Sequence, residues 1–94
     1  MSEAVAYDVE FCARMWRYSG PAGWFFLTVP DEHAPSVTYA WGRAPVMAEV
    51  DGRAWKTSAW REKSGRTLLP VPRAIRGSKG DGDEVKVRLR FDAP

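Results

Sequence analysis

A segment of eight residues occurs twice in this chain, and the second copy restricts the possible folds more than any other feature. Residues 23–30 (GWFFLTVP) and 65–72 (GRTLLPVP) both begin with Gly, continue through six residues and end with Pro. The copies match at two apolar positions, where Leu27 aligns with Leu69 and Val29 aligns with Val71. Apolar, aromatic and β-branched residues favour strands, and Pro ends them. Each copy therefore predicts a buried strand within a repeated unit.

The elements around the two copies follow the same order. Alternating residues and turn residues predict a strand and a turn before each copy, then a short helical segment, a Gly and a last strand after it. The predicted strands are residues 7–16, 24–29, 44–50, 53–60, 67–71 and 84–91, and the predicted helical segments are residues 31–41 and 72–77. Asp51-Gly52 is a typical hairpin turn. The chain thus predicts two β-β-α-β units, residues 7–51 and 53–91, in one domain of residues 1–94.

This arrangement predicts a mainly β fold, a small six-stranded pseudo-twofold (double-split) β-barrel with short helices. A chain of 94 residues is long enough for one core. Both units belong to one chain, so no strand has to come from a partner, and we expect a monomer. The apolar run from Trp24 to Leu27 predicts burial on both faces or at a barrel end, with Trp24 in the core and Trp60 more exposed. Truncation of Trp24 to Ala would then cost about 3–5 kcal/mol.

Charge is distributed unevenly along the chain. The net charge is +2, but residues 1–52 hold three basic and seven acidic side chains, whereas residues 53–91 hold eleven basic and four acidic ones. This asymmetry indicates an anionic partner for the basic half, although a solvated surface without a partner gives the same composition.

The basic half contains four candidate binding residues: Lys56, Arg66, Arg73 and Arg76. Arg73 and Arg76 are three positions apart in a predicted helical turn, so their guanidinium groups face the same side. Trp55 and Trp60 lie among the basic residues. Arginine beside aromatic rings suits the phosphates and bases of a nucleic acid, and it suits an acidic protein equally well.

The second unit resembles the AbrB-like hairpin of bacterial transition regulators and antitoxins. The matching residues are Gly65-Arg66, Leu69-Pro70, Arg73, Ile75-Arg76 and Gly82-Asp83-Glu84-Val85-Lys86-Val87. In that family two short chains intertwine into one barrel that binds DNA. The resemblance implies that the two units of this chain close one barrel by themselves.

The whole chain is more similar to domain-of-unknown-function family nineteen-oh-five, over residues 7–91. The matching residues are Gly23-Trp24, Val29-Pro30, Gly42-Arg43, Pro45-Val46, Lys56-Thr57-Ser58, Gly65, Leu69-Pro70-Val71, Arg73, Arg76, Gly82-Asp83 and Val85. This resemblance implies a small double-split β-barrel, and no established activity comes with it.

Residue types that serve catalysis and metal binding are few and scattered. His33 is the only histidine and Cys12 the only cysteine, so we expect no metal site and no cofactor. Carboxylates fall in loops rich in Gly or Pro, where their expected role is turn formation; these are Asp31, Glu32, Asp81, Asp83 and Glu84. Alternatively, residues 83–84 provide an ion-pair partner for Arg73 or Arg76. The sequence therefore predicts no catalytic residues.

One cysteine excludes an intramolecular disulfide, and no apolar run is long enough to cross a membrane, so we expect a soluble protein in a reducing, cytoplasmic compartment. The sequence predicts a binding or interaction module without catalysis. Two alternatives stay open: a nucleic-acid-binding regulator of AbrB type, and a small ligand-binding protein or enzyme with a Trp-lined pocket at a barrel end. The regulator requires basic residues on one exposed face, whereas the enzyme requires a cleft where polar groups converge.

Overall fold

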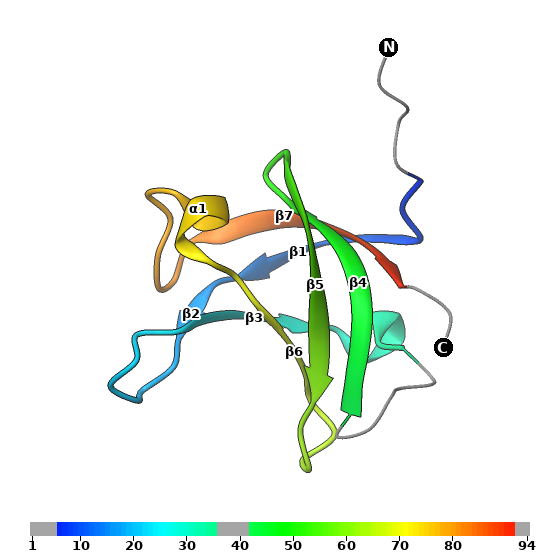
Figure 1. The fold of residues 1–94 in the computed structure, drawn as a ribbon, viewed down its shortest axis with the longest axis horizontal. Coiled ribbons are helices and arrows are strands. Elements are labelled where there is room, and N and C mark those ends of the chain that lie inside the picture. Colours follow the sequence, from blue (N-terminus) through cyan, green and yellow to red (C-terminus); the bar gives the residue numbers. More distant parts are fainter. Residues whose placement is uncertain (1–5, 36–41, 92–94) are drawn as a thin grey trace.

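Seven antiparallel strands form a nearly closed barrel in the computed structural model, which describes residues 6–35 and 42–91 (Figure 1). The strands are β1 (Val9–Arg14), β2 (Trp16–Arg17), β3 (Phe25–Val29), β4 (Arg43–Val50), β5 (Arg53–Arg61), β6 (Thr67–Pro70) and β7 (Glu84–Phe91). The helical segments are a 3-10 turn, η1 (Asp31–His33), and a single α-helical turn, α1 (Arg73–Arg76). The predicted mainly β barrel with short helices is therefore confirmed.

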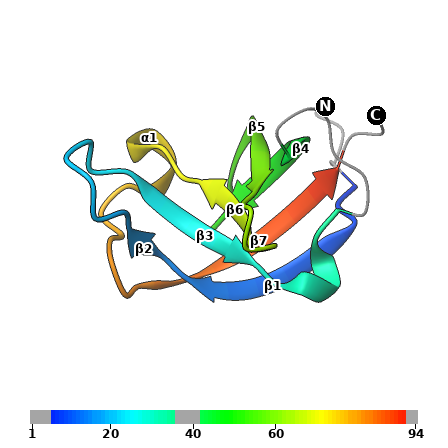
Figure 2. The ribbon, with the colours of Figure 1, turned by 90° about the horizontal axis from the view of Figure 1, so that it is seen from below.

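The barrel closes through the first strand of the chain, which is interrupted at Met15. The order of strands in the sheet is β1-β7-β4-β5-β6-β3-β2. β1, at one end of this order, pairs with β7, and β2, at the other end, pairs with β3. Only Met15 separates β1 from β2 in the chain, so the two ends of the sheet meet there. Figure 2 shows β1 and β2 following one another along the same side of the barrel. The interruption divides the predicted strand 7–16 in two and accounts for seven strands where the alternation predicts six.

The pattern of strand pairing stays the same when the two units are interchanged. β3 pairs with β6, and the repeat-related residues Leu27 and Leu69 face each other directly across this pair. β1 of the first unit pairs with β7 of the second, and β5 of the second unit pairs with β4 of the first. This exchange is the pseudo-twofold relation that the repeated segment predicts.

The first strands of the two units also correspond residue by residue. Trp16 opposes β3, and Trp60 opposes β6 at the corresponding place, so these two tryptophans are repeat-related. The same register relates Met15 to Ala59, and both side chains are fully buried. In each unit, the first strand therefore places a fully buried side chain immediately before its tryptophan.

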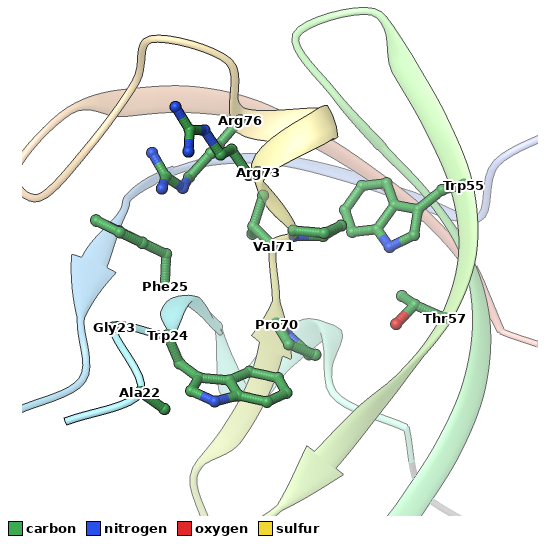
Figure 3. Close-up of a pocket in the computed structure, with 11 residues that line it drawn as sticks. Ala22, Gly23, Trp24, Phe25, Trp55, Thr57, Pro70, Val71, Arg73 and Arg76 are labelled. Atoms are coloured by element: carbon green, nitrogen blue, oxygen red, sulfur yellow. The ribbon is translucent and has the colours of Figure 1, made fainter. Parts of the chain in front are cut away.

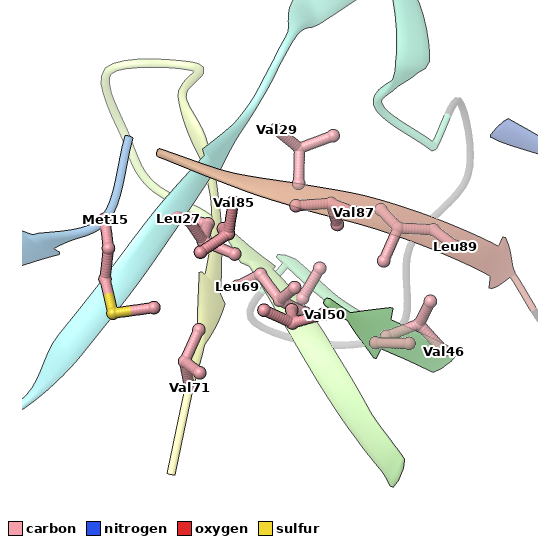
Figure 4. Close-up of a cluster of buried hydrophobic side chains, with 12 residues drawn as sticks. Met15, Leu27, Val29, Val46, Val50, Leu69, Val71, Val85, Val87 and Leu89 are labelled. Atoms are coloured by element: carbon pink, nitrogen blue, oxygen red, sulfur yellow. The ribbon is translucent and has the colours of Figure 1, made fainter. Parts of the chain in front are cut away.

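The core fills the barrel with alternate residues of the strands, because successive side chains of a strand point to opposite faces. In β4, every second residue is buried, and β7 shows the same alternation over most of its length. Figure 4 shows the buried cluster, which consists of Met15, Leu27, Val29, Val46, Ala48, Val50, Ala59, Leu69, Val71, Val85, Val87 and Leu89. Both units contribute to this one cluster.

The helical segments are shorter than the predicted ones. α1 lies within the predicted segment 72–77 and follows Pro72. The predicted segment 31–41 is helical over η1, and its residues 36–41 lie outside the described residues. Neither helix in the described part of the chain has the length and apolar character required to cross a membrane.

The prediction that Trp24 lies in the core is wrong. Its side chain is 55% exposed, more than that of Trp60 at 39%. Leu27 and the partly buried Phe25 point into the barrel, so their neighbours Trp24 and Phe26 point outward. A closed barrel has one interior, and therefore an apolar run cannot be buried on both faces of its strand. Trp24 stacks instead on the outer face against Phe26, with ring centroids 6.1 Å apart.

Candidate ligand pocket

A pocket of about 470 Å³ opens at the end of the barrel where α1 lies (Figure 3). We call it the barrel-end pocket. It is lined by Ala22, Gly23, Trp24, Phe25, Trp55, Thr57, Pro70, Val71, Pro72, Arg73 and Arg76. Small-molecule sites in proteins have volumes of about 300–1,000 Å³, and this pocket falls in that range.

Aromatic rings from distant parts of the chain form its walls. Trp55 is a half-buried residue of β5 that packs against the core, whereas Trp24 is largely exposed. Figure 3 shows the two indoles on either side of Pro70. Thr57 lies two residues after Trp55 on the same face of β5, and its hydroxyl has no hydrogen bond to any other described residue. The walls thus offer flat apolar surface together with one hydroxyl group.

α1 places two arginines at the mouth of the pocket. Arg73 and Arg76 are three positions apart in one helical turn and therefore lie on the same side of it. Ile75, between them, packs against the core. Arg53 of β5 donates hydrogen bonds to two carbonyl oxygens of α1, at 3.4 Å to that of Ala74 and at 3.3 Å to that of Ile75. The turn that carries the arginines is therefore attached to the barrel by packing and by hydrogen bonds.

The two arginines differ in their own contacts. The guanidinium of Arg76 lies over the ring of Phe25, 4.0 Å from its centroid, and Nη1 donates a 3.1 Å hydrogen bond to the carbonyl oxygen of Lys79. The side chain of Arg73 is exposed and has no ion pair or hydrogen bond to the rest of the described chain. Neither arginine pairs with the carboxylates of residues 83–84, so the structure does not contain the alternative ion pair. Arg73 is therefore available to a ligand.

The other two predicted binding residues lie outside this pocket. Lys56 is exposed on the outer face of β5. Arg66 precedes β6, donates a 2.8 Å hydrogen bond from Nε to Glu62, and lies 5.2 Å from the ring centroid of Trp16. The hydrogen bond from Arg66 is the main cause of the lowered pKa of the Glu62 carboxyl. The structure brings together only the two arginines of α1.

An apolar surface adjoins the pocket on the outside of the barrel. Phe26 lies at its centre, with ring centroids 5.2 Å from Trp16, 6.2 Å from Tyr18 and 6.1 Å from Trp24. We call this surface the aromatic groove; it is lined by Tyr18, Trp24, Phe26, Trp60, Glu62, Leu68 and Pro70. Trp24 and Pro70 line both the pocket and the groove.

A third hollow lies at the other end of β6. We call it the basic hollow; it is lined by Gly42, Arg61, Glu62, Lys63, Ser64 and Arg66. Glu62 lines both this hollow and the aromatic groove. The three surfaces are therefore continuous along the outside of β6.

The chemistry of the barrel-end pocket suits binding. Its lining contains no imidazole, thiol or carboxylate, which are the usual groups for general acid–base or nucleophilic catalysis. Within residues 6–35 and 42–91, no group of three or more His, Cys, Asp or Glu side chains could hold a metal ion. Aromatic rings, a hydroxyl and two guanidinium groups can hold a ligand by stacking, hydrogen bonding and charge.

A family model described as Domain of unknown function (DUF1905) matches residues 11–89. The chain belongs to this family. The DUF1905 match includes every residue that lines the barrel-end pocket. It confirms the family resemblance seen in the sequence, whereas the AbrB-like resemblance stays a prediction. A comparison with curated proteins gives no match.

Charge alone does not identify most residues of this DUF1905 pocket. Arg73 and Arg76 stand out in the sequence as a basic pair, but Phe25 and Thr57 carry no sequence signal of binding. Trp24 resembles a core residue in the sequence because it opens an apolar run. One signal in the sequence is the internal repeat, because it allows the residues of the two units to be compared position by position.

Proposed function

We propose that this DUF1905 barrel is a binding module that holds a small ligand in the barrel-end pocket. The observation that carries this proposal is the open volume of about 470 Å³ between Trp24 and Trp55. Burial of apolar surface there is favourable by about 25 cal/mol per Å². The function involves no catalysis, because the lining offers groups for holding a ligand and none of the usual proton-transfer groups.

Thermal unfolding in the presence of small ring compounds that are anionic, cationic or neutral tests this function. A ligand at a hundredfold excess over its Kd that binds only the folded state raises the free energy of unfolding by about 2.7 kcal/mol. We expect Trp55→Ala to abolish this stabilisation, because the variant removes one wall of the pocket. Trp60→Ala is the matched control on the same strand and should retain it. Equal stabilisation of wild type and Trp55→Ala, or no stabilisation by any compound, would contradict the proposal.

A second candidate function is binding of a single-stranded nucleic acid, and the continuity of the three surfaces along β6 favours it. Aromatic side chains, among them Trp24 and Trp60, occupy the middle of this path, and cations lie at both ends. Base stacking on aromatic rings combined with phosphate pairing is how proteins hold single strands with little sequence preference. This function is the form of the nucleic-acid alternative that the surface supports best.

Binding of labelled single-stranded DNA and RNA at two salt concentrations tests the second candidate. Replacement of both Arg73 and Arg76 by Ala should weaken binding and reduce the salt slope by about one unit for each phosphate that the variant no longer neutralises. Arg14→Ala changes an exposed cation of β1 outside the three surfaces and should leave the slope unchanged. Absence of binding even at low salt would exclude this candidate.

The proposed module acts as a monomer in a reducing, cytoplasmic compartment. Support for a monomer comes from the presence of both units in one chain. Support for a reducing compartment comes from Cys12, which is exposed and is the one cysteine of the sequence.

A further inference from the structure

The two repeat-related ends of the barrel differ in charge and in what lies against their aromatic residues. The register that aligns β1 with β5 relates Phe11 to Trp55. Extending the alignment of the two eight-residue copies by one position relates Asp31 to Arg73. The two ends of the barrel can therefore be compared directly, because each has an aromatic ring and a charged residue at corresponding positions.

At the end that carries Phe11, a second ring lies against this aromatic residue. His33 of η1 stacks on Phe11 with ring centroids 5.8 Å apart and planes 19° apart, and the neighbouring Asp31 and Glu32 are exposed acids. At the other end, Trp55 faces an open pocket whose mouth is basic. Barrel geometry by itself would treat repeat-related ends alike. The positive charge of the pocket therefore comes from side chains of the second unit, whereas residues of both units line its open volume.

The described residues that line the pocket do not neutralise its positive charge. Two guanidinium groups belong to the lining, which contains no carboxylate. Figure 3 shows both arginine side chains extending to the side of the pocket formed by Phe25. Arg76 is fixed there by its ring contact and by its hydrogen bond to Lys79, whereas Arg73 has all its donors free of other described residues. Guanidinium groups bind carboxylates and phosphates through paired, charge-assisted hydrogen bonds.

We propose, resting on the binding function above, that the ligand is a small planar anion. Its ring lies against Trp24 and Trp55, and its carboxylate or phosphate accepts hydrogen bonds from Arg73. Thr57 provides a hydroxyl for a polar substituent on the ring. We expect the repeat-related end not to bind the same ligand, because His33 stacks on Phe11 there and Asp31 would repel the anion.

Calorimetric titration with three compounds that share one ring system tests this assignment. The compounds are 2-naphthoate, 2-naphthyl phosphate and the neutral 2-naphthamide. We expect at least one anion to bind about tenfold more tightly than the amide, as a charge-assisted hydrogen bond predicts. The relative affinities of the carboxylate and the phosphate show which head group the pocket prefers. Arg73→Gln should remove the preference for the anion.

Arg14→Gln removes the same charge from an exposed site outside the pocket and should keep the preference. Equal affinity for the amide and both anions, or a preference that survives in Arg73→Gln, would overturn the planar-anion assignment while leaving the binding function intact. Absence of binding by all three compounds also overturns the assignment. The binding function itself is tested by the broader thermal screen and by Trp55→Ala, so the two failures are distinguishable.

Discussion

Replacement of Leu27 by Ala is expected to lower the free energy of unfolding by about 2–5 kcal/mol. The Leu27 side chain is fully buried and faces Leu69 across the β3–β6 pair, where the two units meet. Truncation removes apolar contacts and leaves a cavity bordered by both units. Small domains have about 5–15 kcal/mol of stability in total, so denaturant unfolding should show a large shift of the midpoint.

Trp24→Ala is the matched comparison for this prediction. It removes a larger side chain three positions earlier in the same run, but that side chain is 55% exposed. Its stacking on Phe26 contributes about 1 kcal/mol beyond the apolar area that it buries, and we expect a smaller decrease in stability than for Leu27→Ala. A decrease for Trp24→Ala that equals or exceeds the decrease for Leu27→Ala would contradict the outward placement of Trp24.

Met15→Ala is expected to destabilise the protein by a similar amount, about 2–5 kcal/mol. Met15 lies where the first strand leaves β7 and joins β3, and its side chain is fully buried. Its backbone N–H donates to the carbonyl oxygen of Asp83 at 2.8 Å, and its carbonyl oxygen accepts from the N–H of Gly82 at 2.7 Å. These backbone bonds hold the residue in place, so the neighbouring chain cannot collapse into the space that a shorter side chain leaves.

Met15→Leu keeps most of the side-chain volume and should cost less than about 1.5 kcal/mol. The repeat-related residue, Ala59, shows that the second unit fills the corresponding place with a small side chain. Wild-type stability of Met15→Ala, measured by thermal and denaturant unfolding, would mean that the barrel does not depend on Met15 for its closure.

Local patterns in the sequence determine much of this fold. Strand alternation and the position of Pro depend on neighbouring residues, and the predicted strands coincide closely with β3 to β7. Asp51-Gly52 forms the predicted hairpin turn, with φ of 48° and 87°, because Gly and Asp tolerate positive φ. The repeated segment predicts the pseudo-twofold pairing of β3 with β6, and the spacing of Arg73 and Arg76 places both on one side of α1.

Only the tertiary structure decides which face of an apolar run is inside and which distant residues meet. The sequence makes Trp24 as apolar as Leu27, but closure of the barrel places the first outside and the second in the core. The same closure brings residues 22–25 and 70–76 to the open side of Trp55, whereas it leaves Lys56 on the outer face of β5. The physical reason is that alternation relates residues two positions apart, while the neighbours across a pocket depend on strand pairings between residues far apart in the chain.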